Sequence, residues 1–118
     1  MALITSHTLN SVNGTHAGNI EVELIRICQL GEREALLKTS TDDGGRFSEE
    51  VSLSVKACAD RYELVFQTGK YFEDQNRPVS GMKVMEEVVI RFAMPDPNGK
   101  YHMPLMLSPN GYSVWYSS

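Results

Sequence analysis

The amino-acid sequence predicts a single all-β domain, built as a sandwich or a barrel. Apolar and polar residues alternate with a period of two along most of the 118-residue chain, as they do in strands that bury one face. Turn signals rich in Gly, Pro, Asn and Asp separate these segments at 13–14, 43–45, 95–99 and 109–111. Short strands at such spacing are typical of sandwiches and barrels, and a chain of this length can bury one compact core.

The clearest strand is predicted at 20–30. Five of its apolar side chains are expected to share one face: Ile20, Val22, Leu24, Cys28 and Leu30. Glu21 and Glu23 fall on the opposite face, which should be wet. Segments 61–68 and 86–94 repeat the pattern with a second set of apolar side chains: Tyr62, Leu64, Phe66, Val88, Ile90, Phe92 and Met94. Further strands are predicted at 6–10, 34–39, 49–55, 102–108 and 111–118.

One segment, 68–78, lacks this alternation and is predicted to form one or two helical turns. Thr68 is the expected N-cap, and Pro78 should end the helix. The residues from 74 to 85 are polar and then rich in methionine, so we expect a loop there. No internal repeat or linker divides the chain, and residues 1–118 are therefore predicted to form one domain.

Composition excludes several classes of partner. The formal net charge is −4 and the chain has no Lys/Arg cluster, which argues against a nucleic-acid surface. Cys28 and Cys58 lack the spacing of a structural zinc site; they can form one bridge, but we interpret them as small thiols in a reducing compartment. The N-terminus lacks the pattern of a signal peptide and no apolar run approaches ~20 residues, so we expect a cytosolic protein without a membrane partner.

Two histidines and one arginine are the candidates for chemistry. His7 and His102 lie in predicted strands, and Arg46 closes the turn TDDGGR at the base of the next strand. Histidine exchanges protons near neutral pH, and arginine can hold an oxyanion. Each residue also has a structural interpretation, as a hydrogen-bonded strand histidine or as an arginine paired with an aspartate of its own turn. The remaining histidine, His16, lies in a turn and is interpreted as exposed.

Six blocks of sequence, taken in order, resemble a known family: SHTLN, NGTHAGNI, TSTDDGGR, YELVFQTGKYF, EEVVIRF and YHMPLMLSPNGYS. Together they are similar to the 5-hydroxyisourate hydrolase family, the transthyretin-related proteins, over nearly the whole chain. The resemblance implies a sandwich of two four-stranded sheets with one short helix. It also implies that the chain dimerises edge to edge and that dimers meet face to face in a homotetramer, for which Tyr112 and Trp115 are candidate interface anchors.

The resemblance further implies an active site made of His7, Arg46 and His102. In this family the C-terminal tetrapeptide Tyr-Arg-Gly-Ser helps to line the cleft. Here the chain ends in a different set: Trp115, Tyr116, Ser117 and Ser118. We expect Trp115, Tyr116 and Ser118 to contact substrate, although the charged five-donor arginine fork is absent. Two softer departures are Asn10, where aspartate is usual, and His16, where proline is common.

The activity implied by the resemblance is hydrolytic ring opening of 5-hydroxyisourate in urate degradation. A histidine would take the proton of an attacking water and return it to the departing nitrogen, while Arg46 stabilises the oxyanion. No cofactor or metal is required, although two neighbouring histidines can bind zinc adventitiously. The altered tail leaves two alternatives open. One is an enzyme acting on another cyclic amide or lactone, and the other is a non-catalytic small-molecule binding protein.

Overall fold

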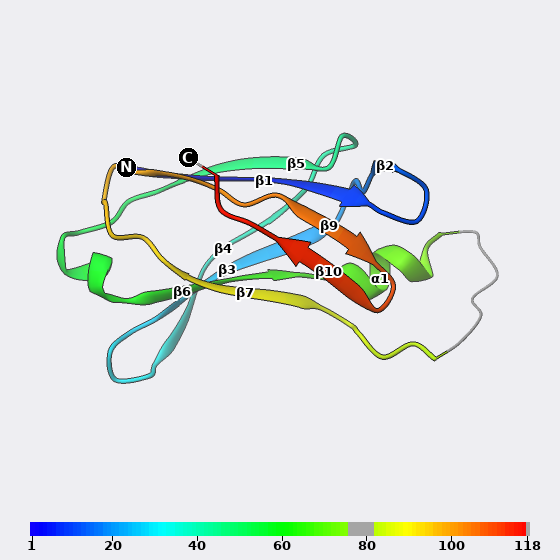
Figure 1. The fold of residues 1–118 in the computed structure, drawn as a ribbon. Helices are drawn as coiled ribbons and strands as arrows, with labels where there is room; N and C mark the ends of the chain where they lie inside the picture. The colour runs from blue at the N-terminus through cyan, green and yellow to red at the C-terminus, as the bar shows by residue number, and fades with distance from the viewer. Residues whose placement is uncertain (76–81, 118) are drawn as a thin grey trace.

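The computed structural model describes residues 1–75 and 82–117 as a two-layered β-structure (Figure 1). Its elements, in chain order, are β1 (Ala2–Asn10), β2 (Thr15–His16), β3 (Glu21–Ile27), β4 (Arg33–Ser40), β5 (Arg46–Val51), the 3-10 helix η1 (Lys56–Ala59), β6 (Arg61–Phe66), α1 (Thr68–Glu73), β7 (Val88–Ala93), β8 (Lys100–His102), β9 (Leu105–Ser108) and β10 (Gly111–Val114). No helix among the described residues is long and apolar enough to cross a membrane.

Strand β1 is the centre of the first sheet. The antiparallel strands β5 and β2 pair with one of its edges, and the parallel strands β8 and β9 pair with the other. β10 continues the sheet beyond β9. Since β8 and β9 follow one another along the same edge and are separated only by Met103 and Pro104, they act as one interrupted strand. The second sheet has the antiparallel order β4-β3-β6-β7. This confirms the expected sandwich of two sheets; the first consists of six strand segments, which reduce to the expected four strands when β8 and β9 are counted as one and the two-residue β2 is left aside.

The core fills the space between the two sheets. Along β1 every second residue, from Ala2 to Asn10, is buried, as the pleat of a strand with one covered face requires. The predicted apolar faces of β3 and β6 both face this core. The largest fully buried side chains include Tyr62, Phe66, Ile4, Ile20, Leu24 and Leu64. Burying one such side chain contributes about 1.5–3 kcal/mol, so the core holds β1 in a single register.

The predicted strand at 20–30 is too long. β3 ends at Ile27, after a change of register between Leu24 and Ile25. Gly31 then adopts a φ of 88° in the turn to β4, a conformation that glycine enters without a Cβ clash. Leu30 lies in this turn and is 91% exposed, so its predicted place on the apolar face is wrong. Alternation alone did not reveal that the strand would stop before the glycine.

The predicted helix is present but begins differently. α1 starts at Thr68 itself, and the N-cap residue is Gln67, which makes no side-chain capping hydrogen bond. Thr68 is therefore not the N-cap, and the helix ends at Glu73. The predicted stop, Pro78, lies outside the described residues. α1 lies at the end of the sandwich (Figure 1), where its Tyr71 hydroxyl oxygen accepts a hydrogen bond from Nδ2 of Asn10, the last residue of β1, at 3.1 Å.

Two other boundaries also differ from the prediction. The strand expected at 49–55 begins earlier, at Arg46, and ends at Val51. The strand expected at 111–118 ends at Val114, beyond which only Ser117 makes an isolated bridge, to His102. The earlier start of β5 brings Arg46 into regular pairing with His7 on β1.

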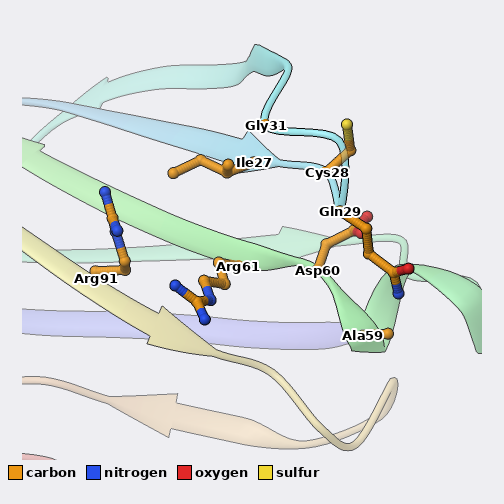
Figure 2. Close-up of a pocket in the computed structure, with 8 residues that line it drawn as sticks. All are labelled: Ile27, Cys28, Gln29, Gly31, Ala59, Asp60, Arg61 and Arg91. Carbon is orange, nitrogen blue, oxygen red and sulfur yellow. The ribbon is translucent and has the colours of Figure 1, made fainter.

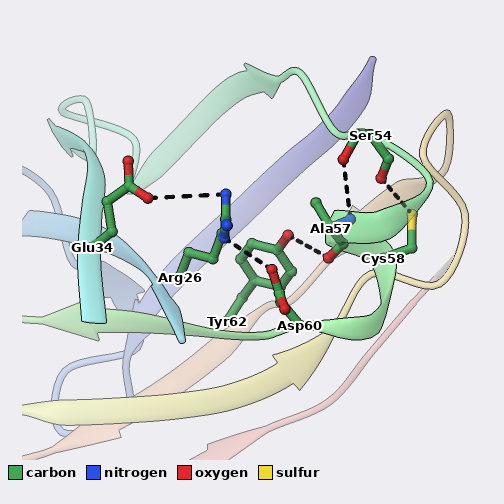
Figure 3. Close-up of polar contacts among 7 residues, drawn as sticks. All are labelled: Arg26, Glu34, Ser54, Ala57, Cys58, Asp60 and Tyr62. Carbon is green, nitrogen blue, oxygen red and sulfur yellow. Dashed lines mark hydrogen bonds and ion pairs between the residues drawn. The ribbon is translucent and has the colours of Figure 1, made fainter. Parts of the chain in front are cut away.

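The helix η1, which the sequence did not predict, is hydrogen-bonded to the second sheet near the start of β6 (Figure 3). The hydroxyl of Tyr62 donates to the carbonyl oxygen of Ala57 at 2.8 Å. Beside it, Arg26 Nε lies 2.9 Å from Asp60 Oδ2, and Arg26 Nη1 lies 3.9 Å from Glu34 Oε2. Because Tyr62 is itself a core residue, this hydrogen bond ties the helix to the sandwich interior.

The two cysteines are both free and partly buried. The Cys58 thiol lies 3.5 Å from the carbonyl oxygen of Ser54 (Figure 3). The sequence allowed either a disulfide bridge or free thiols, and in the structure both thiols are free.

A buried carboxylate lies on the outer face of the second sheet. Glu63, on β6, is 5% exposed and accepts hydrogen bonds from two arginines, one on the adjacent strand β7 and one on β4, which lies beyond β3. These are Arg33 Nη2 on one oxygen and Arg91, through Nε at 3.1 Å and Nη2 at 3.0 Å, on the other. The hydrogen bond from Arg33, with that from Arg91 adding to it, lowers the pKa of Glu63 despite the opposing effect of burial.

Candidate functional site

The three residues predicted for catalysis lie on the outer face of the first sheet. The β1 residues whose side chains point away from the core include Thr5 and His7, which are partly buried. Arg46 pairs directly with His7 across β1 and β5, and His102 pairs with Thr5 across β1 and β8. Directly paired residues in a sheet project their side chains from the same face. The fold therefore places Arg46 on one flank of β1 and His102 on the other, with His7 between them.

The turn before β5 fixes the position of Arg46. The Asp42 Oδ1 atom accepts hydrogen bonds from the backbone N–H groups of Gly44 and Arg46, both at 2.9 Å. Asp43 Oδ1 accepts a hydrogen bond from Asn19 Nδ2 at 3.0 Å. Within residues 1–75 and 82–117, none of the ion pairs includes Arg46. Asp42 thus shapes the turn through backbone hydrogen bonds, and neither aspartate forms an ion pair with Arg46 among the described residues.

The same turn packs tightly against β1. Gly45 has a φ of 77°, and the N–H of Thr8 donates to its carbonyl oxygen at 2.7 Å. A Cβ at Gly45 would lie 2.4 Å from the carbonyl oxygen of Thr8. Only glycine fits this backbone and this space, so the Asp-Gly-Gly sequence brings β5 against β1 with Arg46 opposite His7.

His102 is oriented by a residue that the sequence did not single out. Its Nδ1 atom lies 2.8 Å from the Thr5 hydroxyl oxygen. Its backbone exchanges two hydrogen bonds with Ser117, at 3.3 and 2.8 Å. Of its two ring nitrogens, Nε2 makes no hydrogen bond to another described residue and can meet a ligand. Thr5 was visible in the sequence only as a residue two places before His7 in a strand.

His16, interpreted from the sequence as an exposed residue without a role, contacts His7. The Nε2 atom of His7 lies 2.8 Å from the Nδ1 atom of His16. The hairpin between β1 and β2 pairs His16 with Leu9, which places it diagonally from His7 on the same face. Recognising the Asn13-Gly14 turn as a hairpin would have given this neighbour from the sequence alone.

The surroundings of His7 disfavour its protonated form. Burial is the largest effect lowering the pKa of His7, followed by the charge of Arg46 and by the neighbouring His16 and His102. A backbone hydrogen bond to Gly44 acts in the opposite direction. His7 is therefore held neutral at neutral pH, the state in which an imidazole can accept a proton.

The C-terminal tail runs back beside the strand that carries His102. Beyond β10, the N–H of Trp115 donates to the carbonyl oxygen of Pro104 at 3.4 Å, and Ser117 pairs with His102. The Tyr116 ring lies 6.3 Å from the ring of Tyr101, centroid to centroid. Tyr101 alternates with His102 along β8, so the Tyr116 ring is directed to the opposite side of the strand from the His102 imidazole.

The exposure of these tail side chains leaves their binding role open to test. Trp115 is 47% exposed and Tyr116 is 60% exposed. Ser118, the third residue expected to contact substrate, lies outside the described residues. The expected substrate contacts of the tail stay predictions.

The candidate site is distinct from the hollow drawn in Figure 2. That hollow, of about 450 Å³, lies at one end of the second sheet. The side chains that line it include Cys28, Asp60, Arg61 and Arg91. None of the candidate catalytic residues lines it.

The chemistry of this face is that of two imidazoles and one guanidinium. Such a set can move a proton and stabilise developing negative charge. Among the residues that the structure describes, no group of three or more His, Cys, Asp or Glu side chains is arranged to hold a metal ion. The paired nitrogens of His7 and His16 would supply at most two ligands.

Comparisons with known proteins agree with this architecture. The chain is 35% identical over 115 residues to the 5-hydroxyisourate hydrolase of Halalkalibacterium halodurans, covering 98% of this chain and 97% of that protein. It superimposes on the Klebsiella pneumoniae 5-hydroxyisourate hydrolase with a TM-score of 0.78 at 27% identity, covering 100% of both chains. It also matches a crystal structure of (S)-allantoin synthase, with a TM-score of 0.81 at 28% identity, covering 99% of this chain but 44% of that one. A family model described as the HIUase/transthyretin family matches residues 4–116. The chain belongs to the HIUase/transthyretin family.

Proposed function

We propose that this protein opens the ring of 5-hydroxyisourate by hydrolysis. The observation that carries the proposal is the placement of His7, Arg46 and His102 on one sheet face, in a chain whose relatives include 5-hydroxyisourate hydrolases. Two proton-exchanging groups and a permanent cation are what water attack on an electron-poor ring carbonyl needs.

In this mechanism His102 is the general base. With its proton on Nδ1, the ring donates to the Thr5 hydroxyl oxygen and presents the Nε2 lone pair to a water molecule. The water oxygen bonds to the ring carbonyl carbon, its proton passes to Nε2, and the carbonyl electrons move to the oxygen. Breakage of the carbon–nitrogen bond then returns the proton from His102 to the departing nitrogen. General acid–base help of this kind is worth about 10²- to 10⁴-fold.

Arg46 and His7 act on charge and orientation. The Arg46 guanidinium holds the developing oxyanion with charge-assisted hydrogen bonds. Neutral His7 lies between the arginine and the base, with its Nε2 atom facing His16 and a backbone hydrogen bond to Gly44, and it keeps this part of the face free of a second positive charge.

The enzyme is proposed to work as a cytoplasmic homotetramer that encloses this face. The edge strands β7 and β10 each pair with one neighbour in the chain described here, and both can extend the sheets into a partner. Trp115 is exposed on the tail that runs beside β8. Tyr112 is also exposed, but it pairs with the buried Leu107, so its side chain projects from the other face of the sheet and could contact a partner there. A face-to-face contact between dimers would shield the site from bulk water. Analytical ultracentrifugation checks the assembly, and a monomer at working concentration would contradict it.

The experiment follows the ultraviolet absorbance of freshly prepared 5-hydroxyisourate, corrected for its decay without protein. His102→Ala and Arg46→Ala should each lower kcat/KM by at least about 100-fold. Arg61→Ala is the matched control for Arg46→Ala, because Arg61 is also an exposed residue that begins a strand but lies on the other sheet. A wild type no faster than its His102→Ala variant would refute the proposal.

The altered tail motivates a second candidate function. The resemblance implies an arginine at the place of Tyr116, and without this permanent cation the site loses an anchor for an anionic ligand. A different cyclic amide or lactone would then be the substrate, or the ligand would be bound without reaction. If 5-hydroxyisourate is inert, thermal-shift screening of such compounds, followed by product analysis of the hits, separates these two cases.

A further inference from the structure

The contact between His7 and His16 is not implied by the family resemblance, because proline is common at the position of His16. The two ring centroids are 4.9 Å apart, with planes tilted by 34°, and the facing nitrogens are 2.8 Å apart. Such a hydrogen bond needs an N–H on one ring and a lone pair on the other. Each imidazole therefore constrains the tautomer of its partner.

The β1–β2 hairpin holds His16 in place for this contact. Asn13 Oδ1 accepts hydrogen bonds from the Thr15 N–H at 3.0 Å and from the Thr15 hydroxyl at 2.7 Å. Gly14 takes a φ of 75° at the tip of the turn. The backbone next to His16 is thus shaped by its own sequence and does not depend on the contact with His7.

The groups packed around His7 explain why a partner imidazole matters. Arg46 approaches from β5, His102 from β8 and His16 from β2, and Gly44 contributes a backbone hydrogen bond from the turn before β5. Arg46 repels a proton on His7, whereas a neutral His16 can accept a hydrogen bond from it. His16 is thus the side chain that meets the Nε2 edge of His7 and can either donate a hydrogen bond to it or accept one from it.

We propose that His16 is a positioning residue for His7, holding its Nε2 edge and sharing one proton with it. The inference rests on the proposed function, because it assigns His16 a part in the same ring opening. In the neutral pair an N–H···N hydrogen bond fixes the His7 ring beside Arg46. When the pair gains a proton, the contact becomes a charge-assisted N⁺–H···N bond, and the proton passes between the two nitrogens without any other bond changing.

Two substitutions separate the hydrogen bond from the bulk of the ring. His16→Phe keeps an aromatic ring and removes both nitrogens. His16→Asn places an amide oxygen or nitrogen where Nδ1 stood, so that it can restore the hydrogen bond but cannot titrate. Because His16 is exposed in a short hairpin, neither change should prevent folding, which circular dichroism checks.

The first measurement is an NMR titration of the His7 ring and needs no substrate. Wild-type His7 should respond to two protonation steps, because coupled groups titrate as a pair. In both variants the step that comes from His16 should disappear, while any response of His7 to His102 remains as in the wild type. A single step in the wild type, or an unchanged titration in His16→Phe, would overturn the shared proton.

The second measurement is kcat/KM for 5-hydroxyisourate across pH. We expect His16→Phe to lose about 5- to 20-fold, the range of one hydrogen bond to a group that becomes charged, and His16→Asn to recover to within about threefold. No loss in His16→Phe, or equal losses in both variants, would overturn the positioning role. A wild type that shows two titration steps but does not open 5-hydroxyisourate would support the shared proton and overturn the proposed function instead.

Discussion

Replacing Thr5 with valine should slow ring opening without unfolding the protein. The Thr5 hydroxyl lies 2.8 Å from Nδ1 of His102 and is the contact that orients this imidazole. Valine has nearly the shape of threonine but offers no hydroxyl, and position 5 is on the partly buried outer face of β1. The substitution therefore removes the hydrogen bond and leaves the strand packing intact.

The size of the effect follows from the energy of one hydrogen bond. A neutral, part-buried hydrogen bond contributes about 0.5–1.5 kcal/mol, and 1.4 kcal/mol corresponds to tenfold in rate. We expect kcat to fall by about 3- to 10-fold in Thr5→Val. His102→Ala removes the whole proton-transfer group and should cost about 100-fold or more.

The assay is a double-mutant cycle measured by the decay of 5-hydroxyisourate absorbance. If Thr5 acts only through His102, the double variant should be no slower than His102→Ala alone. Thr39→Val is a suitable control, because the Thr39 hydroxyl donates to Glu49 at 2.9 Å, away from the two histidines. Additive losses in the double variant, or a wild-type rate in Thr5→Val, would refute the orienting role.

Three further predictions test the fold and the tail. Glu63→Gln should destabilise the protein by about 1–2 kcal/mol at pH 7, because the two arginines on its carboxylate are half exposed and the full cost of a buried pair does not apply. The pKa of Glu63 is lowered on folding, so its stabilising effect is complete above its pKa in the unfolded chain, about 4.3, and is lost as the pH falls through its pKa in the folded protein. Urea unfolding curves of wild type and variant, at equal protein concentration, should therefore converge below about pH 4. A difference in stability that stays constant with pH would contradict this. Gly45→Ala should lower the free energy of unfolding by at least about 2 kcal/mol, because alanine is strained at this positive φ and its Cβ would clash with backbone. Gly14→Ala, which has open space at its Cβ, should lower it by about 1 kcal/mol. Equal melting temperatures of the two variants would count against the tight packing of the turn. Tyr116→Phe should leave kcat/KM within about twofold, because its ring lies on the Tyr101 side of the strand, and a larger loss would mean that the hydroxyl reaches substrate.

The sequence predicted the strands best where a strand buries one face. Ile20, Val22 and Leu24 all enter the core as the alternation required. The pattern failed at Leu30 because this residue lies in a turn outside the sheet, where backbone hydrogen bonds set the conformation and the side chain is not buried. The N-cap preference of threonine also failed for Thr68. β6 ends at Phe66 and the helix begins at Thr68, so that Gln67, the one residue between them, is the N-cap.

The candidate site was predictable in its members but not in its supports. His7, Arg46 and His102 were identified through family resemblance, and the register of β1 with β5 and β8 brings them to one face. Thr5 was missed because its contact with His102 depends on a pairing between strands 97 residues apart in the chain. His16 was missed for a different reason, because the Asn13-Gly14 turn was not interpreted as a hairpin that would bring it beside His7.

The central position of β1 has a consequence for how such a protein can change over time. Four other strands are aligned against its nine residues, so inserting or deleting a single residue there would turn His7 inward and expose Ile4 in the same step. A new substrate specificity is therefore easier to reach by replacing side chains around β1 than by changing its length. Insertions and deletions should be tolerated instead at the tip of the β1–β2 hairpin, in the carboxyl-terminal tail and in the loops.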